Sequence, residues 1–199
     1  MISKQANIHS GAKLAENVKV DAFATIYEDV EIGAGSWIGP NAVIMNGARI
    51  GKNVQIFPGA VISGDPQDLK FEGEITTAEI GDNTIIREYV TINKGTKAND
   101  RTVVGKDCLI MSYCHIAHDC VLQDHVILGS YAGLAGEVEV DSWAIVSPGS
   151  LVHQFVRIGA HVMIQGGSKV SKDVPPFAMA GREPVSFTGI NSIGLRLSL

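Results

Sequence analysis

The chain has 199 residues, of which 45% are apolar and 19% charged, so it is long enough for one sizeable domain and its composition excludes a disordered protein. Its formal net charge of −5 argues against a general nucleic-acid binder. The three Cys give no disulfide framework, the start MISKQANIHSG lacks the apolar core of a signal peptide, and no apolar run approaches the roughly 20 residues of a membrane span. We therefore expect a soluble, cytoplasmic protein without stable membrane insertion.

A six-residue repeat runs through most of the chain. Counting in steps of six from Ile8 to Val170 gives 28 positions, and 25 of them hold Ile, Leu or Val. The position two residues earlier favours small or β-branched residues, as at Ala42 and Ala60. Because side chains alternate between the two faces of a strand, both sets face inward from short strands that bend every six residues. Gly often follows the aliphatic position, as at Gly51, and we interpret it as a residue suited to a sharp corner.

The repeat resembles that of the hexapeptide-repeat family. This resemblance implies an all-β fold, the left-handed parallel β-helix, with 18 residues per coil and about nine coils, a rare exception to right-handed crossovers. We expect this β-helix over residues 1–175, with loops that leave it at 64–79 and 93–102. Residues 176–199 would form a partial C-terminal extension, in which a helical region starts around Phe187 to Leu199.

The segment YCHIAHDCVL gathers the residue types of a zinc site. Placed on the repeat, its cysteines fall on small inward positions, as does Cys108, and free Cys behaves there as a small apolar core residue. His115 points the opposite way, and His118 and Asp119 lie at the following corner, facing outward. A metal site that joins these thiols and imidazoles is therefore not expected.

Residues 18 apart should stack on adjacent coils. His118 is then expected beside Gly136, and Gly136 beside Gln154, while His115 stacks on Gly133. A His next to a bare backbone N–H offers a general base close to a hydrogen-bond donor.

Five motifs extend the resemblance to a narrower family, that of the UDP-N-acetylglucosamine O-acyltransferases, which open lipid A synthesis. They are QDLK at 67–70, HIAHDC at 115–120, VHQF at 152–155, IGAHVMI at 158–164 and DVPP at 173–176. The resemblance implies an enzyme that moves an (R)-3-hydroxyacyl chain from acyl carrier protein to the 3-hydroxyl of UDP-N-acetylglucosamine. It also implies a homotrimer with sites between subunits, no cofactor and no metal.

The resemblance assigns roles residue by residue. His118 would be the general base, Asp119 its orienting partner and the N–H of Gly136 the oxyanion hole. Further roles are substrate contact at Asp68, Lys70, His115 and His153, nucleotide contact at Gln154 and Asn191, and the acyl chain at Met163 and Gly166, where Gly leaves room for a long chain. Asn93 and Glu137 stand where the family pattern has His.

Three other functions stay open at this point. A related UDP-sugar N-acyltransferase would carry a separate N-terminal nucleotide-binding domain, for which the start of the repeat at Ile8 leaves no room. A metalloenzyme similar to the γ-type carbonic anhydrases would need a His ligand spacing that the chain does not show. A purely structural or binding prism would retain its function without His118.

Overall fold

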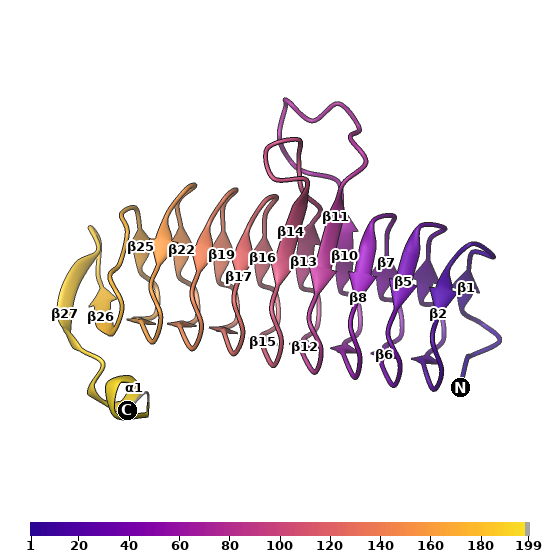
Figure 1. The fold of residues 1–199 in the computed structure, drawn as a ribbon, viewed down its shortest axis with the longest axis horizontal. Helices are drawn as coiled ribbons and strands as arrows, with labels where there is room; N and C mark the ends of the chain where they lie inside the picture. Colours follow the sequence, from indigo (N-terminus) through magenta and orange to yellow (C-terminus); the bar gives the residue numbers. More distant parts are fainter. Residues whose placement is uncertain (198–199) are drawn as a thin grey trace.

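The computed structural model describes residues 1–197, which form an elongated prism of 27 short strands with one short helix at its C-terminal end (Figure 1). Up to β25, each strand pairs in parallel with the strand three places further along the chain, so three sheets run the length of the prism. Where the repeat is uninterrupted, paired residues are 18 apart, as in the row His115, Gly133 and Leu151. The coils therefore stack in the predicted register.

The first sheet contains β1 (Asn7–Ile8), β4 (Thr25–Ile26), β7 (Val43–Ile44), β10 (Val61–Gly64), β13 (Thr91–Asn93), β16 (His115–Ile116), β19 (Gly133–Leu134), β22 (Leu151–Val152) and β25 (Lys169–Val170). The second sheet contains β2 (Lys13–Leu14), β5 (Val30–Ile32), β8 (Ala48–Ile50), β11 (Thr77–Ile80), β14 (Arg101–Val104), β17 (Val121–Leu122), β20 (Glu139–Val140) and β23 (Arg157–Ile158). The third sheet contains β3 (Lys19–Val20), β6 (Trp37–Ile38), β9 (Gln55–Ile56), β12 (Ile85–Ile86), β15 (Leu109–Ile110), β18 (Ile127–Leu128), β21 (Ile145–Val146), β24 (Met163–Ile164), β26 (Ala178–Gly181) and β27 (Ser186–Ile190).

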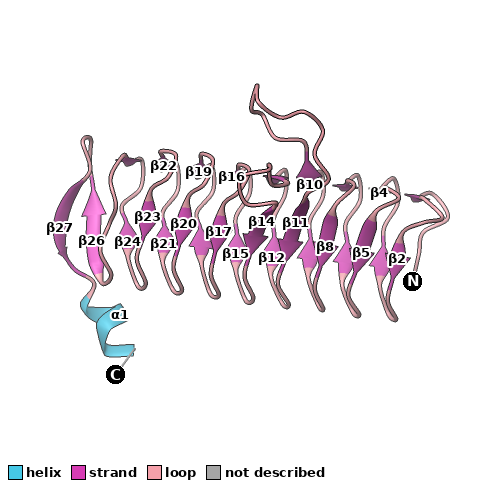
Figure 2. Cartoon of the chain, turned by 45° about the horizontal axis from the view of Figure 1, so that its top comes forward, coloured by secondary structure: helices cyan, strands magenta, loops and turns pink. Residues whose placement is uncertain are grey.

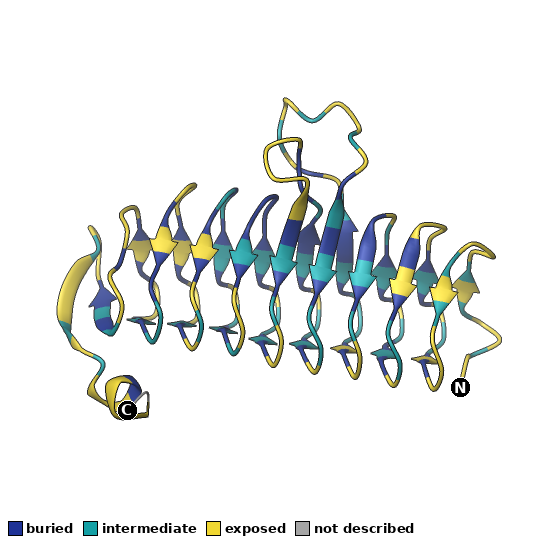
Figure 3. Cartoon of the chain, viewed as in Figure 1, coloured by how far each residue is buried: buried dark blue, intermediate teal, exposed yellow. Residues whose placement is uncertain are grey.

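Aliphatic side chains fill the interior of the prism. The repeat positions on the middle coils, such as Ile86, Ile110 and Leu128, have no exposed surface. Figure 3 shows buried residues recurring from coil to coil along the prism. Cys114 and Cys120 are buried in the same interior and form no disulfide. Removing this apolar surface from water is the main term that stabilises the prism, at roughly 25 cal/mol for each Å².

The glycines that follow the aliphatic positions have a different role from the one we predicted. A Cβ atom on Gly51 would lie 2.8 Å from the backbone nitrogen of Asp82 on the next coil, so this Gly permits close approach of two coils. The left-handed backbone conformation occurs two residues later, at Asn53, where φ is 54°. Asn tolerates that conformation because its short polar side chain bonds locally. The period of the repeat does not indicate which residue at a corner adopts the left-handed backbone conformation.

Two loops interrupt the prism, and both are shorter than predicted. They leave side by side from the middle of the prism, one between β10 and β11 and the other between β13 and β14 (Figure 1). The irregular segments are 65–76 and 94–100, because strand pairing continues beyond the repeat on both sides: Gly64 pairs with Asn93, and Thr77 with Arg101.

The C-terminal end also differs from the prediction. The third sheet continues past residue 175, since Met179 of β26 pairs with Met163, and β27 then returns antiparallel to β26. Residues 187–190, which we expected to begin a helix, are thus a strand, whose backbone is bonded to the last coil. The helix α1 (Ser192–Leu197) lies beyond that hairpin (Figure 2), and residues 198 and 199 of the expected helical region lie outside the described residues. Within residues 1–197, no helix is long and apolar enough to cross a membrane.

The buried cysteines provide a test of the register. Burial raises the pKa of Cys108 and Cys114 to about 11 and that of Cys120 to about 12, and the thiolate is the reactive form. We expect a water-soluble disulfide reagent at pH 8 to modify none of the three thiols of the native protein within minutes, and all three after unfolding in guanidinium chloride. Rapid modification of the native protein at any of them would contradict the inward placement.

Candidate active site

His118 and Asp119 occupy the corner where the chain leaves β16 of the first sheet and enters β17 of the second. The backbone of Asp119 is left-handed, with φ of 61°, and its N–H donates to the hydroxyl of Thr102 at 2.8 Å. We predicted that both side chains face outward. They do point away from the core, but they are only 7% and 1% exposed, because Thr96 of the 94–100 loop contacts Asp119 from outside.

The two side chains form a hydrogen-bonded pair. Nδ1 of His118 lies 2.8 Å from Oδ2 of Asp119. A carboxylate oxygen only accepts, so in the neutral imidazole Nδ1 carries the proton and Nε2 keeps a free lone pair. Nε2 also lies 4.0 Å from Oδ2 of Asp68, which comes from the 65–76 loop. The arrangement leaves one basic nitrogen of His118 for a reacting proton.

Gly136 lies on the next coil, directly against the His118 ring. A Cβ atom at this position would be 2.6 Å from Nε2 of His118 and 3.2 Å from Nε2 of Gln154, so only Gly leaves space for the imidazole. The backbone N–H of Gly136 donates no hydrogen bond to another group among residues 1–197. The predicted row of His118, Gly136 and Gln154 is therefore present, and it combines a base with a free backbone donor.

A groove of about 520 Å³ runs along the outside of the first sheet at this corner. Its lining consists of Gln67, Asn93, His115, Ala117, His118, Gly133, Leu134, Ala135, Gly136, Leu151, Val152, His153 and Gln154. Three imidazoles, three side-chain amides and two glycines thus surround a mostly apolar floor. This mixture suits a ligand with both a polar and an apolar part.

His115 is a second imidazole of the groove. Its Nδ1 is 2.7 Å from the hydroxyl of Thr91 on the preceding coil. Burial lowers the pKa of His115, and the nearby His118 lowers it further. The neutral form is therefore favoured, so His115 can exchange hydrogen bonds with a ligand while adding no positive charge beside His118.

Comparison with known proteins places this geometry in a family. The sequence model of the family described as bacterial transferase hexapeptide (six repeats) matches residues 29–64 and 101–136. An acyl-[acyl-carrier-protein]–UDP-N-acetylglucosamine O-acyltransferase of Burkholderia mallei (strain SAVP1) is 49% identical over 136 residues, which are 68% of this chain and 52% of the relative.

Solved structures agree over the whole described fold. A UDP-N-acetylglucosamine acyltransferase from Bacteroides fragilis 9343 has 52% identity and a TM-score of 0.97, with 100% of this chain and 78% of that chain covered. One from Francisella novicida has 40% identity and a TM-score of 0.97, covering 100% and 73%. The chain belongs to the UDP-N-acetylglucosamine acyltransferase family. Its fold is the left-handed parallel β-helix that resemblance to the hexapeptide-repeat family implies. The chain spans about half, 52%, of the length of the curated relatives that it matches.

Five of the eleven residues that resemblance to this family singled out meet in the groove. His115, His118, Gly136, His153 and Gln154 line it together. Asp119 contacts the Nδ1 side of the His118 ring, and Asp68 of the 65–76 loop approaches its Nε2 side. Lys70 follows Asp68 and donates its backbone N–H to that carboxylate at 3.0 Å, but its side chain is exposed and lies outside the groove lining.

Three predicted residues lie elsewhere in the chain. Met163 is on β24 of the third sheet, and Gly166 follows at the edge between the third and first sheets, with the carbonyl oxygen of Pro148 at 3.3 Å from a Cβ placed there. Asn191 donates to the carbonyl of His161 at 2.7 Å and accepts the N–H of Gly194 in α1 at 3.1 Å. None of the three lines the groove within one chain.

Sequence reasoning missed the contacts that hold the 65–76 loop in place. Nδ2 of Asn93 donates to the carbonyl of Asp65 at 2.9 Å, and Lys94 forms an ion pair with the Asp65 carboxylate at 2.9 Å. These contacts tie the 65–76 loop to β13 and so place Asp68 near His118. Oδ1 of Asn93 is buried without a hydrogen-bond partner among the described residues. The only signal in the sequence was the departure of Asn93 from the family pattern.

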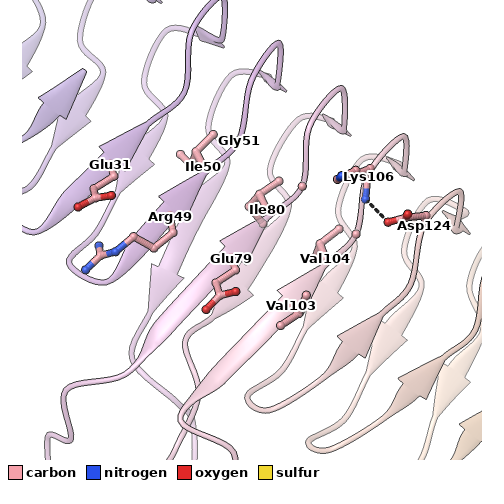
Figure 4. Close-up of a pocket in the computed structure, with 12 residues that line it drawn as sticks. Glu31, Arg49, Ile50, Gly51, Glu79, Ile80, Val103, Val104, Lys106 and Asp124 are labelled. Carbon is pink, nitrogen blue, oxygen red and sulfur yellow. Dashed lines mark hydrogen bonds between the residues drawn. The ribbon is translucent and has the colours of Figure 1, made fainter. Parts of the chain in front are cut away.

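A second depression, on the second sheet, has no comparable set of groups (Figure 4). Two of its charged side chains are in ion pairs, Arg49 with Asp29 at 2.7 Å and Glu31 with Lys13 at 2.9 Å, and the Asp124 carboxylate accepts the backbone N–H of Lys106 at 2.7 Å. Its lining contains no His.

The residues of the possible zinc site are separated as the register predicts. Cys114 and Cys120 lie inside the prism, whereas Nδ1 of His115 contacts Thr91 and Nδ1 of His118 contacts Asp119 outside it. Among residues 1–197, no group of three or more His, Cys, Asp or Glu side chains is arranged to hold a metal ion.

Replacing Gly136 tests the contact between the two coils. The φ of Gly136 is not in the left-handed region, so Gly136→Ala should fold with little loss of thermal stability, but its Cβ must displace the His118 ring. We expect a crystal structure of the variant to show the bond from Nδ1 to Asp119 broken. The control is Gly133→Ala, whose Cβ meets only the flexible end of Leu151 at 3.1 Å. An unmoved His118 ring in Gly136→Ala would contradict this account.

Proposed function

We propose that the chain transfers an (R)-3-hydroxyacyl group from acyl carrier protein to the 3-hydroxyl of UDP-N-acetylglucosamine, as the first step of lipid A biosynthesis. The observation that carries this proposal is the hydrogen bond of His118 to Asp119 on one coil, with Gly136 of the next coil lying against the His118 ring. The names of the relatives, which specify the acyl carrier protein and the UDP-sugar, support it. We place the reaction in the cytoplasm.

The geometry fits one acyl transfer without a cofactor. Nε2 of His118 takes the proton of the sugar 3-hydroxyl as its oxygen attacks the thioester carbonyl, which forms a tetrahedral oxyanion. The Gly136 N–H donates to that oxyanion, a contribution of the oxyanion-hole type. The intermediate then releases the thiolate of the carrier, and the proton on Nε2 passes to the sulfur. Asp119 keeps Nδ1 protonated throughout.

The sugar nucleotide and the acyl chain would occupy different ends of the groove. We assign contacts with the sugar nucleotide to Asp68, Lys70, His115 and His153, and contacts with the nucleotide end to Gln154 and Asn191. We assign the acyl chain to Met163 and Gly166. In one chain Met163 lies on β24 of the third sheet and Gly166 at the corner that follows it, and neither lines the groove beside His118. The assignment therefore requires a second copy whose third sheet faces this groove, which supports a homotrimer with sites between subunits.

The base can be tested directly. His118→Ala should lose about 10²- to 10⁴-fold in acyl transfer, since a positioned general base contributes that much. The measurement follows acylated UDP-sugar formed from 3-hydroxyacyl carrier protein, with UDP-N-acetylglucosamine or its 3-amino analogue as acceptor. His9→Ala, on the first coil, serves as the control. Full activity in His118→Ala would exclude the mechanism, and transfer to the amine alone would favour the N-acyltransferase alternative.

The acyl-chain assignment makes a second prediction. A side chain at Gly166 has open space apart from the Pro148 carbonyl, so Gly166→Met should fold and fill part of the acyl site. We expect the parent to prefer long 3-hydroxyacyl chains and the variant to prefer chains several carbons shorter. Sedimentation equilibrium of both proteins should give a trimer. An unchanged chain preference, or a monomer that is fully active, would contradict the assignment.

A further inference from the structure

Thr96 is a residue of the 94–100 loop that does not line the groove. It is 9% exposed, and both of its donors reach the carboxylate of Asp119. Its backbone N–H donates to Oδ1 at 2.9 Å, and its hydroxyl donates to Oδ2 at 2.6 Å. Oδ2 is the oxygen that also accepts from Nδ1 of His118. One residue therefore holds both oxygens of the group that orients the base.

The orientation of the Thr96 hydroxyl is fixed by a third group. The N–H of Ala98 donates to Oγ1 of Thr96 at 3.2 Å. Because this bond uses a lone pair of Oγ1, the hydroxyl proton is free to point at Asp119. The result is a chain of hydrogen bonds from Ala98 through Thr96 and Asp119 to His118, and bonds to a carboxylate are stronger than neutral ones.

The loop itself is held against the 65–76 loop. The hydroxyl of Thr76 donates to the carbonyl of Gly95 at 2.6 Å, and Lys97 forms an ion pair with Glu72 at 3.1 Å. Within the loop, the N–H of Asp100 donates to the carbonyl of Thr96 at 2.8 Å. Thr96 thus sits on a segment anchored on both sides, although it lies outside the six-residue repeat.

We propose that Thr96 is a positioning residue for acyl transfer: its hydroxyl fixes the Asp119 carboxylate and thereby keeps the proton of His118 on Nδ1, with Nε2 aimed at the sugar hydroxyl. This inference rests on the proposed function. The proposed role differs from a purely structural one because it determines the tautomer of the His118 imidazole. That tautomer can be measured without any substrate.

The test compares two substitutions at one position. Thr96→Val removes the hydroxyl but keeps the branched shape and the backbone N–H, whereas Thr96→Ser keeps the hydroxyl. Thr76→Val is the matched control, because it also removes a buried hydroxyl from the same pair of loops but leaves Asp119 untouched. Each protein is labelled with [¹⁵N]histidine, and the His118 resonances are assigned from the spectrum of His118→Ala. The ring nitrogen shifts then report which nitrogen is protonated.

We expect the Nδ1–H tautomer of His118 in the parent, in Thr96→Ser and in Thr76→Val, and a mixture of tautomers in Thr96→Val. In the transfer assay, kcat of Thr96→Val should fall about 10- to 100-fold, the order expected for one lost bond to a charged group and a misaimed base. Its KM for UDP-N-acetylglucosamine should stay within twofold, because Thr96 does not line the groove.

Each result bears on the inference separately from the proposed function. A parent without transfer activity would refute the proposed function, while the nitrogen shifts would still decide the role of Thr96. An unchanged tautomer in Thr96→Val, a defect of equal size in Thr96→Ser, or the same shift in Thr76→Val would each overturn the role assigned to Thr96.

Discussion

The whole structure depends on the backbone hydrogen bonds between successive coils. The column of aliphatic side chains inside the prism keeps these bonds in register. Each coil presents the same faces as the coil before it, so a residue and its neighbour 18 positions later lie one strand spacing apart, about 4.8 Å. This is the reason why His118 meets Gly136. A slip of one residue would turn every inward side chain outward, so burial of the aliphatic set makes the register strict.

The same constraint explains how a rigid and repetitive scaffold can carry chemistry. Side chains at inward positions pack in the core, as the three buried cysteines illustrate. Reacting groups can therefore stand only at the corners and on the outer faces. At the His118 corner the prism supplies the base, the bare Gly and the apolar floor of the groove. It also supplies Asp119, which orients the base. The groups that contact this pair from outside come from the two loops: Asp68 from one and Thr96 from the other. Hydrogen bonds and ion pairs join the two loops to each other.

Much of the fold and part of the site could be predicted from the sequence. The inward cysteines, the outward imidazoles and the row His118, Gly136 and Gln154 all follow from counting in sixes and eighteens, and the structure confirms them. Counting fails where the repeat stops. The loops proved shorter at both ends, residues 187–190 form a strand, and the corner glycines serve close packing, because pairing with a neighbouring coil overrides local preference at those places.

The sequence by itself determined the period, and with it the solenoid, the inside and outside of every strand and the neighbours of each coil residue, since these depend only on alternation and burial along a regular repeat. The tertiary structure alone decided how the two irregular segments fold over the His118 corner. Their contacts join residues 19 to 50 positions apart without periodicity, from Thr76 and Gly95 to Asp68 and His118, and the energy of such contacts depends on side-chain geometry that no repeat encodes. The burial of His118, the hydrogen bonds from Thr96 to the Asp119 carboxylate and the approach of Asp68 all depend on this folding of the loops.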